Sequence, residues 1–221
     1  MNFNPLGNFD VSLPLNTSAL AEAKLYLIHL PICTSNSIRR IYGHWTVGHG
    51  DQDFPDYNGS VAFDGNRHHL HMPHDPRDNA IGMNNNTPAS HTYRRNTGAF
   101  GIATDDMVFA TTHDFGPEGV TMLALEYLCA GIAAVAKKYN VDLNGVVRGG
   151  PYAGEHTFFT HAEAADHTGN PAQYEPYGPA STFERWDFLT FVPIPQGVTF
   201  TDSSICGNAI RKRAHDYKVK L

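Results

Sequence analysis

The chain has 221 residues, of which 16 are Lys or Arg, 22 are Asp or Glu and 13 are His, giving a formal net charge of −6. At about 150 residues per domain, this length predicts one domain with extensions. A hydrophobic share of 41% excludes a disordered chain, and the acidic balance argues against nucleic acid as the main partner. No apolar run approaches the length of a membrane span, so we expect no membrane insertion.

The first predicted element is a helical pattern from Ser18 to His29, within an N-terminal arm of residues 1–36. Strand-like patterns follow, separated by loops rich in Gly, Asp, Pro and Asn. These predicted strands are Ser37–Thr46, Gly59–Phe63, Arg67–Met72 and Gly98–Thr104. On the first of them, alternation places Tyr42 and His44 on one face.

A helix is predicted from Pro117 to Tyr139, because apolar residues recur there with a helical period. Pro117 fits the first helical position, and two lysines occupy the last turn. Val146-Val147 and His156–His161 are predicted strands, and the basic stretch Arg211–Leu221 is predicted to be a surface tail. Strands alternating with one strong helix predict an α/β domain with a central mixed sheet flanked by helices.

Histidine is nearly as common as Lys and Arg together, and it is the commonest metal-ligating side chain. The three cysteines are far apart with no CxxC pair, which excludes a thiolate zinc site. The densest histidine cluster offers His69, His71 and His74 as one candidate metal site, with Asp75 nearby. The alternative is a polar edge strand with solvated imidazoles.

A second candidate set is dispersed along the chain. His44 lies in a predicted strand before a glycine loop, and His161 lies at the end of another predicted strand. Catalytic zinc typically takes three protein ligands and leaves a fourth position open. Candidates for the third ligand are Asp166, His167 and Asp187, and spacing alone does not choose among them.

Several stretches, in order, resemble the motifs of the zinc-dependent N-acetylmuramoyl-L-alanine amidases, a superfamily that includes phage lysozyme-type amidases and peptidoglycan recognition proteins. The similarity covers residues 37–192, and the predicted long helix also matches. The matching stretches are Gly43–Gly48 (GHWTVG), Asp56–Gly65 (DYNGSVAFDG), Ser90–Thr92 with Arg95–Ile102, Thr160–Glu163 (THAE) and Arg185–Asp187 (RWD).

This resemblance implies a single amidase domain over residues 37–192, followed by a C-terminal extension over 193–221. It implies zinc as cofactor, with His44, His161 and Asp187 as ligands. Arg185 corresponds to a lysine that stabilises the oxyanion in many members, and Tyr57 to a tyrosine near the metal. His91 and Asn96 correspond to the wall of the substrate groove.

Two departures concern the catalytic base and the spacing of the ligands. The glutamate that serves as base in some members is absent, so Asp105, the nearest acid, or less favourably Glu163, is the candidate. Tyr57, Asp105 or zinc-bound water could relay a proton to the leaving amine. The gap between His161 and Asp187 is also longer than is common in the family.

The resemblance therefore predicts a peptidoglycan hydrolase that cleaves the amide between N-acetylmuramic acid and L-alanine with zinc-activated water. The alternatives are a non-catalytic peptidoglycan-binding module on the same fold, or an unrelated metallohydrolase using His69, His71 and His74. Met1 to Asp10 has no secretory-signal pattern. We therefore expect synthesis in the cytoplasm and action after release by phage lysis or effector delivery, or else cytoplasmic wall recycling.

Overall fold

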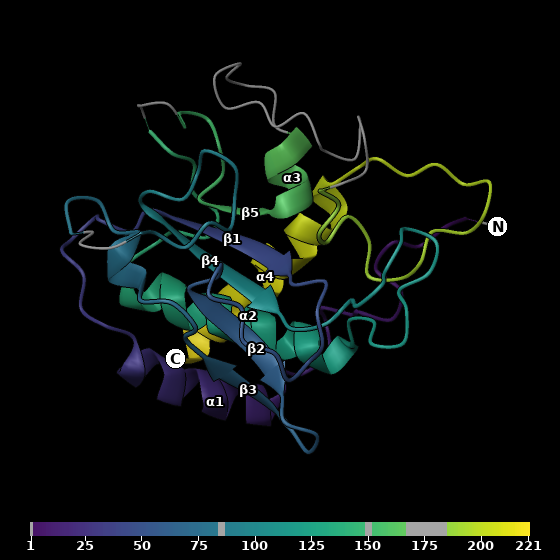
Figure 1. Ribbon diagram of the computed structural model, residues 1–221, viewed down its shortest axis with the longest axis horizontal. Coiled ribbons are helices and arrows are strands. Elements are labelled where there is room, and N and C mark those ends of the chain that lie inside the picture. Colours follow the sequence, from purple (N-terminus) through teal and green to yellow (C-terminus); the bar gives the residue numbers. More distant parts are fainter. Residues whose placement is uncertain (1, 84–86, 149–151, 167–184) are drawn as a thin grey trace.

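A computed structural model describes residues 2–83, 87–148, 152–166 and 185–221. Its centre is a mixed five-stranded sheet in the order β3-β2-β4-β1-β5 (Figure 1). The β2–β3 pair is antiparallel, and the β2–β4, β4–β1 and β1–β5 pairs are parallel. The strands are β1 (Arg40–Trp45), β2 (Gly59–Phe63), β3 (His68–His71), β4 (Ala99–Thr104) and β5 (Phe158–Thr160). The expected α/β architecture is confirmed.

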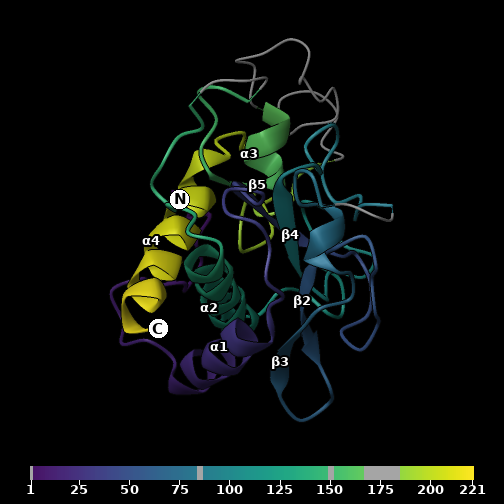
Figure 2. The same cartoon turned by 90° about the vertical axis from the view of Figure 1, so that its left-hand side faces the viewer.

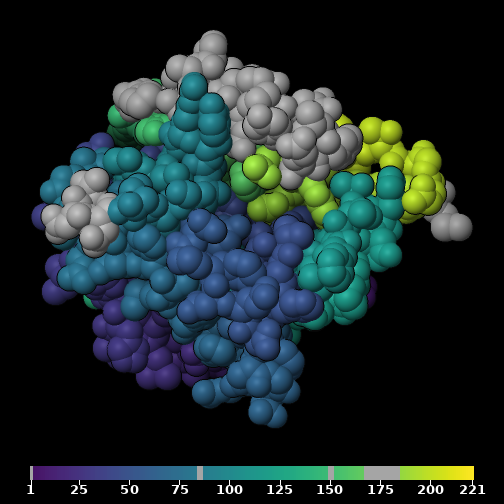
Figure 3. Space-filling model, in the orientation of Figure 1, coloured from purple at the N-terminus to yellow at the C-terminus, as the bar shows by residue number. Residues whose placement is uncertain are grey.

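Three helices cover one face of the sheet, as Figure 2 shows, with α2 between α1 and α4. Their bounds are α1 (Thr17–His29), α2 (Met122–Lys138) and α4 (Ser204–Lys220), and the shorter elements are η1 (Pro76–Asp78) and α3 (His161–Asp166). Among the described residues, no helix is both long and apolar enough to cross a membrane. The opposite face of the sheet carries loops, and residues 46–58 (blue) form the centre of this surface in Figure 3.

The two faces of β4 differ in side-chain size, and this difference decides where the helices and loops pack. Phe100 and Ile102 point into the main core beneath α2. On the other face, Gly101 leaves room for a loop side chain, because a Cβ at this position would lie 2.3 Å from Cγ of His91. The small residue therefore allows the His91 ring to lie directly against the sheet.

Helix α2 is shorter at its start than the sequence predicts. It begins at Met122, and the hydroxyl of Thr121 caps it by accepting a hydrogen bond from the Ala124 amide at 3.0 Å. Pro117 is therefore not at the first helical position. Glu118 instead binds the loop between β1 and β2. Its carboxylate lies 2.7 Å from His49 Nδ1 and accepts a hydrogen bond from the Gly50 amide.

Three other element predictions are corrected by the structure. The expected strand 156–161 is reduced to β5, because the chain turns into α3 at His161. Val146 forms only an isolated bridge with His156. The expected surface tail Arg211–Leu221 is the second half of α4, apart from its last residue.

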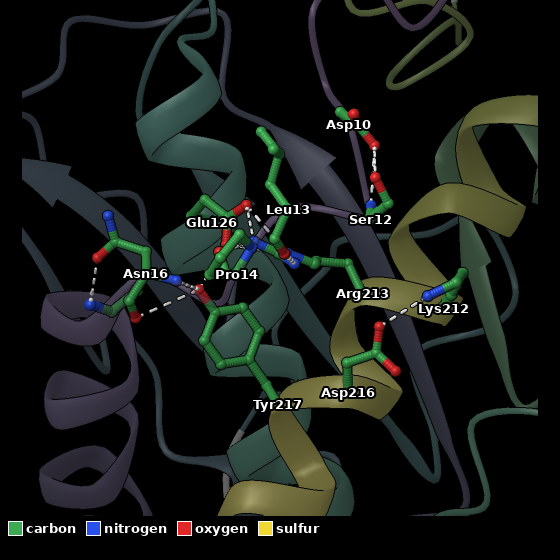
Figure 4. Close-up of polar contacts among 11 residues, drawn as sticks. Asp10, Ser12, Leu13, Pro14, Asn16, Glu126, Lys212, Arg213, Asp216 and Tyr217 are labelled. Carbon is green, nitrogen blue, oxygen red and sulfur yellow. Dashed lines mark hydrogen bonds and ion pairs between the residues drawn. The ribbon is translucent and has the colours of Figure 1, made fainter.

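Helix α4 is held to the domain by two arginines that the sequence suggested were solvated. Arg213 pairs with Glu126 of α2 at 2.7 Å and donates to the carbonyls of Leu13 and Pro14, which fastens the N-terminal arm (Figure 4). Tyr217 donates to the same Glu126 carboxylate. A single acidic side chain of α2 thus joins both extensions to the core.

Arg211 makes the second attachment of α4, to Glu163 of α3. Its Nη2 atom lies 2.6 Å from Glu163 Oε1, and both side chains are almost completely buried. Gly207, one turn earlier, leaves room for this carboxylate, because a Cβ there would lie 2.0 Å from Glu163 Oε2. Glu163 also accepts a hydrogen bond from the Thr160 amide, so the pair fixes the junction between β5 and α3.

We expect Arg211→Met to destabilise the protein by about 3–5 kcal/mol, because it leaves the Glu163 carboxylate buried without its counter-charge. The free energy of unfolding, measured by urea denaturation, checks this. Lys212→Met is the matched control, since Lys212 belongs to an exposed pair with Asp216 and should leave stability near wild type. Equal stability of the two variants would contradict the role of the buried pair.

Candidate metal centre

The register of β1 and β5 brings two distant histidines together. The strands are parallel, and Gly43 pairs with Thr160. His44 and His161 each follow these paired residues, so they lie side by side at the carboxyl edge of the sheet. Their Nδ1 atoms are 3.1 Å apart although 117 positions separate them in the sequence. This edge is where parallel sheets typically place ligand-binding side chains.

Asp187 completes the group. Its Oδ2 atom lies 3.3 Å from His44 Nδ1 and 3.1 Å from His161 Nδ1. The backbone carbonyl of Asp187 accepts a hydrogen bond from the Ala162 amide at 3.2 Å, which ties this loop to the first turn of α3. Among the described residues, these three are the only group of His, Cys, Asp or Glu side chains close enough to hold one metal ion.

The donor set fits a divalent cation such as zinc. Three ligand atoms face one point, with mutual distances of 3.1–3.3 Å. Tetrahedral zinc with Zn–N bonds of about 2.0–2.1 Å separates its ligand atoms by about 3.3–3.4 Å. A cation at this point would accept one lone pair from each of the two imidazole nitrogens and from the carboxylate oxygen.

The electrostatics of the group favour the ligating form of Asp187. Burial raises the pKa of the Asp187 carboxyl, but the neighbouring imidazoles, His161 first and then His44, outweigh burial and hold that pKa below its usual range. Asp187 is therefore ionised at neutral pH. A carboxylate and two neutral imidazoles leave a bound divalent ion with a net charge of +1.

The group forms one wall of a cavity of about 410 Å³. Of the residues that the sequence assigned to catalysis or substrate binding, Tyr57, His91 and Arg185 line this cavity together with the ligands His161 and Asp187. The remaining lining residues received no role from the sequence: Trp45, Thr46, Val47, Asp56, Ser90 and Tyr93. All of them except Tyr93 lie within the motif stretches, so the sequence indicated their segments but not their part in the cavity.

Tyr57 and His91 are both uncharged at neutral pH. Burial, and then the charge of Asp187, raise the pKa of the Tyr57 phenol, so it remains protonated. Its hydroxyl contacts the Trp45 carbonyl at 3.4 Å, and its ring centre is 5.2 Å from that of His44. Burial, together with the nearby His44, lowers the pKa of His91 well below its usual value. Both side chains can therefore act as neutral hydrogen-bond donors.

Three other expected site residues make structural contacts and do not line the cavity. Asp105 does not line the cavity, because its carboxylate is buried and lies 3.4 Å from His71 Nε2. The side chain of Asn96 accepts a hydrogen bond from the Thr92 amide at 2.9 Å and so stabilises its own loop. Glu163, the weaker candidate for the base, is paired with Arg211. The structure thus gives each of these polar groups a structural partner.

The alternative histidine cluster is dispersed. His71 lies near Asp53 and Asp105, whereas His74 lies 3.4 Å from Asp78. His69 contacts His71 through its ring, with 5.5 Å between the ring centres. Of the other candidates for the third ligand, Asp166 ends α3, and His167 falls outside the described residues.

Comparison of the chain with family models, with curated proteins and with solved structures gave no match. The candidate metal centre therefore rests on its own geometry.

We expect His44→Ala and Asp187→Ala to lose bound divalent metal, because each removes one of the three ligands that the described residues offer. Metal per chain, measured by atomic emission after dialysis, should fall from near one to near zero. The triple variant His69→Ala/His71→Ala/His74→Ala is the control and should retain its metal. Metal retained by His44→Ala but lost by the triple variant would move the metal site to the histidine cluster.

Acid should destabilise the metal-free protein, partly through His91. Its folded-state pKa is depressed, so below about pH 6.5 the unfolded chain binds a proton that the folded chain does not. The stability contribution is present above that pH and is lost as pH falls, with a slope of up to about 1.4 kcal/mol per pH unit. Urea unfolding between pH 7.5 and 5.5 measures it.

In the same pH series, His91→Asn should show a shallower decline than wild type. His29→Asn, at an exposed position of α1, should follow the wild-type curve. Identical slopes for wild type and His91→Asn would show that His91 is not held neutral by the fold.

Proposed function

We propose that the protein is a zinc-dependent hydrolase that cleaves the amide between N-acetylmuramic acid and L-alanine in peptidoglycan. The observation that carries the proposal is a centre to which the described residues contribute three ligands, at the wall of an open cavity. A structural zinc site is usually closed by four protein ligands, whereas a catalytic site leaves one position for water or substrate.

The ligands differ in exposure, and this gives the centre an open side. His44 is fully buried, whereas His161 and Asp187 both line the cavity. Zinc held by these residues would polarise a substrate carbonyl and lower the pKa of water, which is the chemistry that amide hydrolysis needs. The ionised Asp187 and the two imidazoles would hold the ion on the cavity wall.

Two cavity residues are suited to stabilise negative charge on the carbonyl oxygen. Arg185 brings a guanidinium to this wall of the cavity. The phenol of Tyr57, beside His44, would be a second donor on exchanging its 3.4 Å hydrogen bond to the Trp45 carbonyl for one to that oxygen. Donors aimed at the carbonyl oxygen stabilise the charge that develops there.

A proton acceptor is also available in the cavity. Asp105 is excluded from that role by its burial beside His71. Asp56, adjacent to Tyr57, is the other carboxylate besides Asp187 among the described residues that line the cavity. We therefore assign to Asp56 the proton transfer that sequence reasoning gave to Asp105.

Peptidoglycan as substrate is supported by the ordered resemblance of residues 37–192 to the zinc amidases. The residues that carry that resemblance and the residues that meet in space agree at six positions: His44, Tyr57, His91, His161, Arg185 and Asp187. A chance similarity of short motifs has no reason to place these side chains around one cavity.

We expect purified protein to release free stem peptides from murein sacculi and to leave intact glycan strands, as identified by mass spectrometry of the products. Chelation should abolish release and added zinc should restore it, because the ion supplies the Lewis acid. His161→Ala should release peptide only at the background rate. Cleavage by His161→Ala at the wild-type rate would refute the proposal.

The same assay separates the amidase from a peptidoglycan-binding module. Sedimentation of the protein with sacculi and without any released product would indicate binding alone. Cleavage within the peptide or the glycan would instead indicate a different hydrolase at the same centre.

A further inference from the structure

The hydroxyl of Thr92 lies between two buried imidazoles, one of which is a metal ligand. Its Oγ1 atom is 3.2 Å from His44 Nε2 and 2.9 Å from His91 Nδ1. Thr92 and His91 are almost completely buried, and His44 is fully buried. Because water has little access, each polar atom of this chain must find its hydrogen bond within the protein.

The metal ligand fixes the direction of the hydrogen bonds. His44 faces the centre with Nδ1, which must keep its lone pair to bind a cation, so its ring proton resides on Nε2. That N–H then donates to Thr92 Oγ1. Since the hydroxyl already accepts from His44, its own proton is free to be donated to His91 Nδ1.

The hydrogen bond from Thr92 also determines which nitrogen of His91 carries a proton toward the cavity. With Nδ1 accepting, a neutral His91 carries its proton on Nε2. That nitrogen is buried and has no hydrogen-bond partner within the described part of the chain, and His91 lines the cavity. An unpaired donor at this place is available to an oxygen atom of a ligand.

The loop around Thr92 holds the hydroxyl in place. The Thr92 amide donates to Asn96 Oδ1 at 2.9 Å, and its carbonyl accepts from the Arg95 amide at 3.0 Å. Gly101 of β4 lets the His91 ring lie against the sheet, as described above. Asn96, expected in the substrate groove, therefore acts on the site through Thr92.

We propose that Thr92 is a positioning residue whose hydroxyl sets the tautomers of both His44 and His91. It keeps Nδ1 of His44 free for the metal and makes His91 Nε2 an oriented donor for a substrate oxygen. The inference rests on the proposed zinc function of the same centre. Without the hydroxyl, the Nε2 proton of His44 loses its hydrogen bond to Thr92, which shifts the balance toward the tautomer that cannot bind metal through Nδ1.

Outer hydrogen bonds of this kind are typically worth 10–100-fold in metal affinity. We expect Thr92→Val, which keeps the shape but not the hydroxyl, to weaken zinc binding by about that factor in competition with a chelating dye. Thr92→Ser should bind within about threefold of wild type, because it restores the hydroxyl. Thr97→Val, at an exposed position of the same loop, is the matched control and should equal wild type.

A second measurement observes the tautomer of His91 directly. Nitrogen-15 NMR of the zinc-loaded wild-type protein should show His91 protonated on Nε2 and not on Nδ1, with its signals assigned by their loss in His91→Gln. In Thr92→Val this preference should weaken, whereas in Thr92→Ser it should persist.

The results distinguish this inference from the proposed function. If wild type binds no zinc, both are overturned. If wild type binds zinc and Thr92→Val binds it equally tightly, or Thr92→Ser is as weak as Thr92→Val, only the role of Thr92 is overturned. A His91 ring protonated on Nδ1 in the wild-type protein also overturns it.

Discussion

The parallel register between β1 and β5 is the constraint on which the candidate site depends. It places Gly43 opposite Thr160, and the residue after each of them is a histidine of the candidate metal centre. A shift of one residue would turn one imidazole to the other face of the sheet, toward the helices. The end of β5 matters equally, because the turn into α3 at His161 removes this residue from strand alternation.

The C-terminal helix supports this geometry from behind. Arg211 of α4 neutralises Glu163, and Glu163 accepts from the Thr160 amide immediately before the ligand His161. Arg213 meanwhile fastens α4 to α2 and to the N-terminal arm. Segments that lie outside the amidase-like stretch of sequence are therefore part of the structure that holds the second ligand.

The polar residues of the site form two layers with different tasks. The inner layer is His44, His161 and Asp187, whose lone pairs converge on one point. Behind His44, Thr92 supplies the hydrogen bond that a buried imidazole needs on its other nitrogen. His91 extends this hydrogen-bonded chain to the cavity surface, where substrate chemistry would take place.

Sequence patterns alone were enough to predict the class of fold, the positions of most strands and helices, and the three residues that meet at the candidate metal centre. Strand alternation and helical period are local, and the ordered motifs singled out His44, His161 and Asp187. The prediction of a surface tail over 211–221 was wrong. A basic stretch predicts solvent exposure unless its partners are known, and here Arg211 and Arg213 form buried ion pairs.

The choice of polar groups around the candidate metal centre depends on how the chain folds. Asp105 and Thr92 are both short polar residues close to a predicted motif, and nothing local separates them. Folding turns Asp105 toward His71 and Thr92 toward His44, because each orientation depends on contacts between strands and loops that are distant in sequence. Hydrogen-bond partners of this kind are set by packing and leave no periodic pattern in the chain.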